Sequence, residues 1–154
     1  MSIDYIVSSL PPLAFGQPAP LSWERFAAQL PNGALDAPLA VWRDLETQLR
    51  NAMAEARSGE RFKRPADGCS LFWKNRVLAC FQERDVAKRD ALLDRVWWDA
   101  AGELTPPASP LGAGALATYA IRLKVALKRT KISQSAGNAA FDRLTAETKL
   151  TNIK

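Results

Sequence analysis

Apolar side chains recur at intervals of three and four residues along most of the chain, a spacing that predicts amphipathic helices. The clearest helix is expected over residues 36–58, where one stripe contains Leu39, Trp42, Leu45, Leu49, Met53 and Ala56. Asp36 is a good N-cap residue, and Gly59 suits the position after the last turn. We expect this helix to bury its apolar stripe and to expose its opposite side.

Three further helices are predicted in the first two thirds of the chain. Ser22 can cap a short helix over residues 23–30, which Pro31-Asn32-Gly33 would end. Asp67 or Ser70 can cap a helix running to Phe81, and a charged stretch then leads into a helix that stops at Gly102. The pattern leaves open whether these last two are one long helix or a hairpin.

The termini and the proline-rich segments give weaker signals. Residues 3–9 are rich in β-branched and aromatic side chains and run into Leu10-Pro-Pro, so we expect an extended arm or a short strand. Leu13 and Phe15 are expected to anchor this arm. Near the C-terminus, Gly137-Asn138 predicts a break before a last helix, which Phe141 and Leu144 would anchor.

The segment 112–131 has the most regular pattern in the sequence. One predicted stripe contains Leu116, Tyr119, Ala120, Leu123 and Leu127, and basic side chains border it on both sides: Arg122 and Arg129 on one, Lys124, Lys128 and Lys131 on the other. Long basic side chains can cover the edges of an apolar stripe with their methylene groups while their charges stay in water. Ile121 and Val125 fall on the opposite face and are expected to be exposed.

These elements together predict an all-α protein, a single-domain helical bundle with an extended N-terminal arm. We divide residues 1–154 into an extended arm and Pro-rich connector (1–21), a helical core (22–104), a Pro-rich linker (105–111) and basic C-terminal helices (112–154). A chain of 154 residues is long enough for one real core. The longest nearly apolar run, near residues 111–121, is too short to span a bilayer.

The composition excludes several classes of chemistry. The chain has no histidine, which excludes Ser-His-Asp and Cys-His catalysis and His-based zinc sites. Cys69 and Cys80 would lie about 16 Å apart on a continuous helix, too far for a disulfide, and are expected to be free and buried. We therefore predict no enzyme activity, no cofactor and no metal. Carboxylate or lysine catalysis would need a deep pocket with convergent ionisable groups.

The net charge of +5 is concentrated near the C-terminus. Residues 109–154 hold eight Lys/Arg and two acids, whereas residues 1–108 hold thirteen Lys/Arg and fourteen acids. This excess is compatible with a solvated helix face, with a nucleic-acid site or with an acidic protein partner. The predicted partner-binding residues are Arg122, Lys124, Lys128, Arg129, Lys131 and Trp98, the last because Trp97 and Trp98 cannot both face one core.

Two stretches resemble known families. Residues 5–16 (YIVSSLPPLAFG), followed by Pro18, Pro20, Ser22 and Phe26, look like the start of an uncharacterised bacterial family encoded in V-type ATPase operons. Residues 117–124 (ATYAIRLK), followed by Arg129, Ile132, Gly137 and Phe141, are similar to the helical repeat of the V-type ATPase C-subunit family, although this protein is much shorter. The resemblance implies an all-helical protein acting at the rotary ATPase, without an active site.

The sequence therefore leads to two hypotheses about function. The first is a non-catalytic subunit or an accessory or assembly factor of a bacterial V-type ATPase, which binds ATPase subunits through protein contacts. The second is a nucleic-acid-binding protein that uses the basic helix 112–131. With no predicted membrane span and no basic, apolar leader at Met1, we expect a cytoplasmic location, peripheral to the inner membrane when held in an ATPase complex. The oligomeric state stays open.

Overall fold

The chain forms an all-α structure, as predicted. The computed structural model describes residues 2–152, with the side chains of 60, 61 and 147–152 left out of the description, and within this part of the chain there is no strand. In chain order the elements are α1 (Ile3–Ser9), α2 (Trp23–Ala27), α3 (Asp36–Ser58), η1 (Gly59–Phe62), α4 (Leu71–Cys80), α5 (Val86–Ala101), η2 (Gly102–Leu104) and α6 (Ala113–Asn152).

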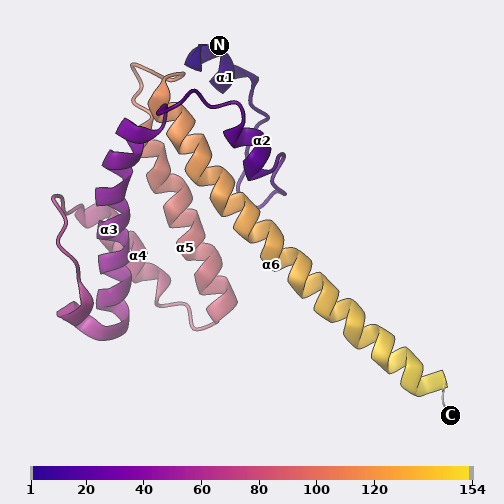
Figure 1. The fold of residues 1–154 in the computed structure, drawn as a ribbon. Coiled ribbons are helices and arrows are strands. Elements are labelled where there is room, and N and C mark those ends of the chain that lie inside the picture. The colour runs from indigo at the N-terminus through magenta and orange to yellow at the C-terminus, as the bar shows by residue number, and fades with distance from the viewer. Residues whose placement is uncertain (1, 153–154) are drawn as a thin grey trace.

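Four helices form the body of the molecule. α3 and α6 start near the same end and diverge, with α5 between them and α4 packed against α3 (Figure 1). The main core lies among these helices and contains Trp42, Leu45, Leu49, Trp73, Val77, Leu93, Val96, Leu104, Ala117 and Ile121. The predicted stripe of α3 supplies Trp42, Leu45 and Leu49 to this core, whereas Ala56 is exposed and Ala52 is buried instead. The hydrophobic effect of these side chains holds the bundle together.

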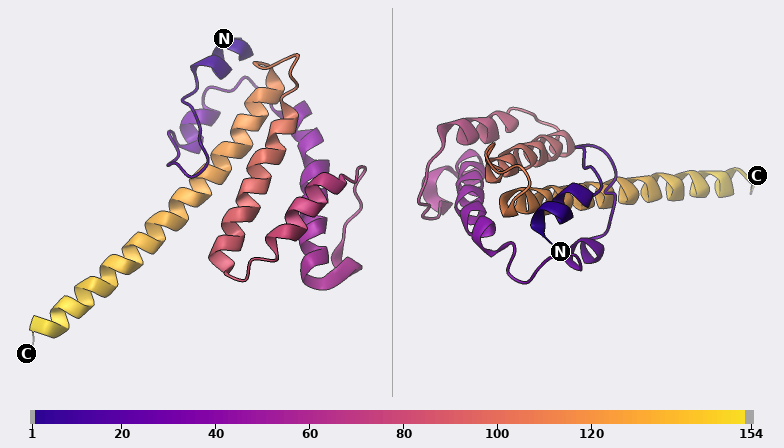
Figure 2. Two further views of the ribbon diagram at one scale, coloured as in Figure 1. Left: turned by 180° about the vertical axis from the view of Figure 1, so that it is seen from behind. Right: turned by 90° about the horizontal axis from the view of Figure 1, so that it is seen from above.

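The first half of α6 is covered from two sides. The body packs on one side of it, while α1, α2 and the connector between them wrap around the other (Figure 2). A second core forms there from Ile6, Phe26, Leu116, Ala120 and Leu123. Ile121 and Val125, expected to be exposed, are instead 7% and 8% exposed. That prediction was wrong because α6 is sandwiched between two layers and buries more than one stripe.

Residues 3–9 form a helix, so the prediction of an extended arm or strand was also wrong. The Ser2 side chain caps this helix by accepting a hydrogen bond from the Tyr5 amide, at 3.4 Å. Ile6 is buried, and Ile3, Val7 and Leu10 pack around the same cluster against α6. Contacts with α6 therefore outweigh the strand propensity of the β-branched side chains. Extended backbone begins at Leu10, before the two prolines.

The segment around residues 70–101 contains two helices, which settles the point left open by the pattern. Ser70 caps α4 by accepting from the Trp73 amide, and Asp85 caps α5 by accepting from the Lys88 amide at 3.0 Å. Cys69 and Cys80 are both free. Cys80 is buried as expected, but Cys69 precedes α4 and is exposed, because it lies in the connector and not in a packed helix.

α6 is one continuous helix, and the predicted break at Gly137-Asn138 is absent. Gly137 does not adopt a positive φ, so it does not end the helix. In a helix interior, glycine is only about 1 kcal/mol less favourable than alanine. Beyond residue 130 the helix leaves the body and projects alone (Figure 1). Phe141 and Leu144 are 69% and 63% exposed, so they do not anchor it as predicted.

The start of α6 is fixed by a close approach to η2. A Cβ added to Gly114 would collide with the carbonyl oxygen of Leu104. One turn later, buried Thr118 donates its hydroxyl hydrogen to the Ala101 carbonyl oxygen at 2.8 Å and contacts the Thr105 hydroxyl at 2.7 Å. These contacts fix the start of α6 against the end of α5 and η2.

We expect Gly114→Ala to lower the free energy of unfolding by about 1–3 kcal/mol, because the added methyl group overpacks the contact with Leu104. Urea unfolding followed by circular dichroism measures this change. Gly137→Ala is the matched control in the same helix, since nothing lies within 4 Å of its added Cβ. The control should retain stability and gain helicity. Equal stability of both variants would contradict the proposed close packing.

Candidate functional site

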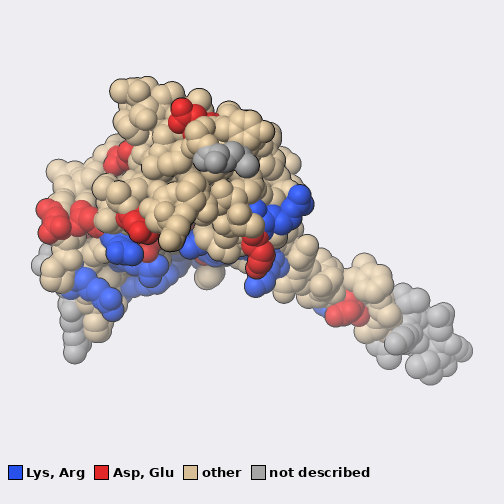
Figure 3. All heavy atoms as spheres, turned by 45° about the horizontal axis from the view of Figure 1, so that its top comes forward, with Lys and Arg blue, Asp and Glu red and all other residues tan. Residues whose placement is uncertain are grey.

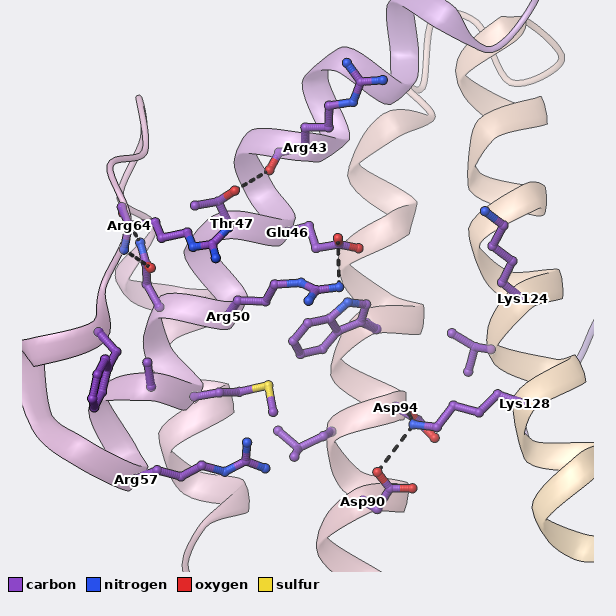
Figure 4. Close-up of a pocket in the computed structure, with 17 residues that line it drawn as sticks. Arg43, Glu46, Thr47, Arg50, Arg57, Arg64, Asp90, Asp94, Lys124 and Lys128 are labelled. Carbon is purple, nitrogen blue, oxygen red and sulfur yellow. Dashed lines mark hydrogen bonds and ion pairs between the residues drawn. The ribbon is translucent and has the colours of Figure 1, made fainter. Parts of the chain in front are cut away.

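A cleft of about 950 Å³, open to solvent, lies between α3, α5 and α6. Charged side chains extend into it from all three helices (Figure 4), and apolar side chains lie between them. We call it the basic cleft; its charged members are Arg43, Glu46, Arg50, Arg57, Arg64, Asp90, Asp94, Lys124 and Lys128. The apolar members include Met53, Ala54, Phe62, Leu93, Trp97 and Val125.

One wall of the basic cleft is an arginine ladder on α3. Arg43, Arg50 and Arg57 are separated by seven residues each, so they lie on one side of the helix at intervals of about 10.5 Å. Arg50 and Arg57 point from α3 toward α5 (Figure 4). Arg50 pairs with Glu46 at 3.2 Å, and the Arg57 guanidinium lies 5.5 Å from the centroid of Phe81. Within residues 2–152, Arg43 has no recorded ion-pair partner.

The connector after α3 folds back and brings Arg64 to the same wall. Asn51 holds its backbone by accepting from the Arg64 amide at 2.8 Å and donating to the Arg64 carbonyl at 2.7 Å. Asp44 accepts from the backbone amides of Asp67 and Gly68, at 2.6 and 3.1 Å. Gln48 accepts from the Ser70 amide. Asp44, Gln48 and Asn51 thus supply hydrogen-bond partners for residues 63–70, which form neither helix nor strand.

The hydrogen bonds of Asp44 have an electrostatic consequence. Its pKa lies below the ordinary value, first because Gln48 donates to the carboxylate at 2.8 Å and then because the Asp67 amide does so. These donors favour the charged form. The ionised Asp44 carboxylate thus holds the connector at Asp67 and Gly68.

The opposite wall of the basic cleft is an ion-pair network between α5 and α6. Lys128 lies 2.8 Å from Asp94 and 3.3 Å from Asp90, and Arg129 lies 3.3 Å from both carboxylates. Asp94 is only 7% exposed. Burial lowers the pKa of Lys128, but its hydrogen bonds and charge interactions with Asp94 and Asp90 outweigh this effect and raise the pKa. Lys128 therefore stays protonated.

The charges in the basic cleft do not cancel. Six cationic and three acidic side chains line it, and each of the three acids already has a partner: Glu46 binds Arg50, and Asp90 and Asp94 bind Lys128 and Arg129. Lysines and arginines gather along this underside of the body (Figure 3). The arrangement attracts anions.

The structure brings only part of the predicted partner-binding set into this site. Lys124 and Lys128 line the basic cleft, and the Lys124 ammonium lies 4.6 Å from the ring centroid of Trp23 on α2. Lys131 is exposed where α6 leaves the body. Arg129 is held by Asp90 and Asp94.

Trp98 is buried and Arg122 is half-buried, and neither of these two predicted partner-binding residues lines the basic cleft. Trp98 is 6% exposed and packs edge-on against Phe15, at 5.6 Å between ring centroids. The Arg122 guanidinium lies over the Trp98 ring and donates a hydrogen bond to the Trp98 carbonyl oxygen at 3.0 Å. Burial lowers the pKa of Arg122. The neighbouring Trp97, and not Trp98, lines the basic cleft.

The arginine ladder was missed in the sequence, although a signal for it exists. Residues 36–64 hold six Lys/Arg and five acids, so their summed charge is close to neutral. Only the spacing shows that Arg43, Arg50 and Arg57 share one side of a helix, while Asp44 lies on another and binds the connector. A search for like charges at intervals of seven within the predicted helix would have found the wall.

We expect Asp44→Asn to destabilise the protein at pH 7, because the variant loses an ionised acceptor for two backbone amides. A carboxylate with a lowered folded pKa contributes stability above its unfolded pKa of about 3.9, and the contribution is lost as the pH falls through the folded pKa. The difference from wild type in urea unfolding should therefore shrink below about pH 4. Asp142→Asn, an exposed carboxylate on α6, is the control. A difference that is independent of pH would contradict this role of Asp44.

Comparisons with known proteins add no relative to these observations. No protein family, curated protein or solved structure matches the chain. Among the helices of residues 2–152, none combines the length and the hydropathy needed to cross a bilayer. The functional argument therefore starts from the basic cleft itself.

Proposed function

We propose that the chain is a non-catalytic binding protein that docks an acidic protein segment in the basic cleft. The observation that carries this proposal is the excess of three positive charges over an apolar floor. Charged walls increase the rate of association and select the sign of the partner, while a desolvated apolar floor supplies affinity. The cleft offers both in one place.

We further propose that the partner is a component of a bacterial V-type ATPase, so that this protein serves as a subunit or as an accessory or assembly factor of that complex. The support for this step is the resemblance of residues 5–26 to a family encoded in V-type ATPase operons. Ile6 and Phe26 of this segment pack on α6. In this proposal, the segment therefore supports the helix that forms one wall of the cleft.

A protein segment suits the basic cleft better than a nucleic acid does. Glu46, Asp90 and Asp94 lie among the cations and would repel phosphates, whereas a polypeptide can place neutral or basic side chains beside them. Phe62 and Trp97 are the aromatic side chains in the lining, whereas the aliphatic Met53, Leu93 and Val125 between the walls suit the apolar side of a polypeptide better than a row of stacked bases. Binding of RNA or DNA that weakens steeply with salt would favour the nucleic-acid hypothesis instead.

We expect the double variant Arg43→Glu/Arg64→Glu to reduce recovery of rotary ATPase subunits about tenfold when the tagged protein is used as bait in extracts of its own source organism. These two side chains have no recorded ion pair in the part of the chain that the structure describes, so the fold should persist. Nuclease-treated extracts, mass spectrometry and far-UV circular dichroism provide the readouts.

The control for this experiment is Arg25→Glu/Arg84→Glu, which changes the net charge equally at exposed positions outside the basic cleft. It should recover ATPase subunits like wild type. Failure of the wild-type protein to recover any ATPase subunit would refute the ATPase assignment. Equal loss in both double variants would refute the cleft as the docking site.

Asp94→Asn should act on stability and binding in opposite directions. Removing the buried charge leaves Lys128 and Arg129 without their main partner, which should lower the free energy of unfolding by about 1–3 kcal/mol. The same change adds positive charge to the cleft and should strengthen binding of poly-L-glutamate several-fold. Urea unfolding and fluorescence anisotropy at low salt measure the two effects. Weaker binding by a folded variant would argue against an acidic ligand.

A further inference from the structure

The geometry of the basic cleft points to a specific kind of occupant, and we infer that this occupant is an acidic amphipathic α-helix. This inference rests on the proposed function, because it names the form of the acidic segment that docks there. Three features of the cleft carry it: the arrangement of its walls, the character of its floor and the spacing of its arginines.

The walls of the basic cleft are two helices with a third helix as the floor. α3 and α6 meet near their starts and then diverge, and α5 lies between them (Figure 1, Figure 4). Arg43 and Arg57 are fourteen residues apart, which corresponds to about 21 Å along α3. A docked helix of about four turns spans that length. It would lie beside α3 and α6 in the way neighbouring helices of a bundle pack.

The floor of the basic cleft offers an apolar strip in the middle of the charged walls. Leu93 and Val125 are largely buried, and Met53 and Trp97 pack against the main core while still lining the cleft. The apolar side of an amphipathic helix can cover such a strip, and its flanking positions then reach both walls. This is the helix-in-groove mode of recognition, in which anchors recur at three- and four-residue intervals.

The spacing of the arginine ladder selects a helix over an extended strand. Arg43, Arg50 and Arg57 repeat every 10.5 Å or so, which is also the rise over seven residues of a docked helix, so acids at i, i+7 and i+14 can meet them one to one. In a strand the same distance corresponds to about three residues at 3.3 Å each. Successive third residues of a strand point to opposite faces, so a strand cannot present its acids to all three arginines.

A second copy of this protein does not match the basic cleft. The exposed part of α6, residues 131–146, carries two cations and one acid, and so lacks the required row of carboxylates. The negative charge must come from another protein. Acids on the far side of the docked helix would meet Lys124 and Lys128 on α6.

Three synthetic peptides of equal length and equal leucine and glutamate content test this inference with the full-length protein. The first is a helix with a leucine stripe flanked by glutamates at seven-residue spacing. The second is helical but places its glutamates opposite the leucine stripe, and the third has the first pattern with two central prolines that break the helix. Poly-L-glutamate and single-stranded poly-uridine are the other probes. Fluorescence anisotropy gives the affinities at low and moderate salt.

We expect the first peptide to bind at least about tenfold more tightly than the other two. Arg43→Glu/Arg64→Glu should abolish this preference, whereas Arg25→Glu/Arg84→Glu should keep it. Met53→Gln, which preserves the length of a half-buried floor side chain but makes it polar, should weaken the first peptide and leave poly-L-glutamate unchanged.

The outcomes separate this inference from the proposed function. Equal binding of all three peptides would overturn the helical occupant while an acidic partner remained supported. Absence of binding to every acidic probe at low salt would overturn both. Tighter binding of poly-uridine than of the first peptide would also overturn both, in favour of a nucleic-acid ligand.

Discussion

The burial of the first half of α6 between two layers is the constraint on which the rest of the structure depends. Its Leu116 and Leu123 are fully buried against the N-terminal segment, while Ala117 and Ile121 belong to the core of the body. Because the contact of Gly114 with η2 fixes where α6 starts, the direction of the helix is set before it passes α3. The two helices then separate, and the basic cleft is the space between them.

Electrostatics and packing have separate parts in this site. Asp94 is buried and holds Lys128 and Arg129, so the α6 wall is positioned by internal ion pairs that also reduce its free charge. The α3 wall is different, because Arg43 is exposed and Arg64 is held by its backbone, with Asn51 as partner. One wall therefore serves the fold as well as binding, and the other is available to a ligand. This difference explains why reversing Lys128 is a poorer test of docking than reversing Arg43 and Arg64.

The sequence predicted those elements in which local pattern and tertiary packing agree. The apolar stripe of α3 and the N-caps at Ser22 and Ser70 could be predicted without knowing which elements pack beside them. Residues 3–9 were misjudged because contacts with α6 override their strand propensity, and Ile121 was misjudged because a helical wheel assumes a single buried side. In the site, Lys124 and Lys128 were predicted from charge density. The arginine ladder was not predicted, because acidic side chains that face the connector offset its positive charge when the charges of residues 36–64 are summed.

The apolar and the charged side chains of the basic cleft have opposite effects on its walls, which bears on the kind of ligand that fits it. An apolar floor favours closure of the walls, since Met53 and Trp97 would lose their remaining contact with water. Closure would bring the arginines of α3 toward Lys124 and Lys128, and like charges repel more strongly as water is excluded between them. The like charges on the two walls therefore oppose closure of the cleft. A ligand that covers the floor and carries carboxylates toward both walls removes the repulsion and buries the floor in the same step, which neither a purely apolar nor a purely anionic ligand can do.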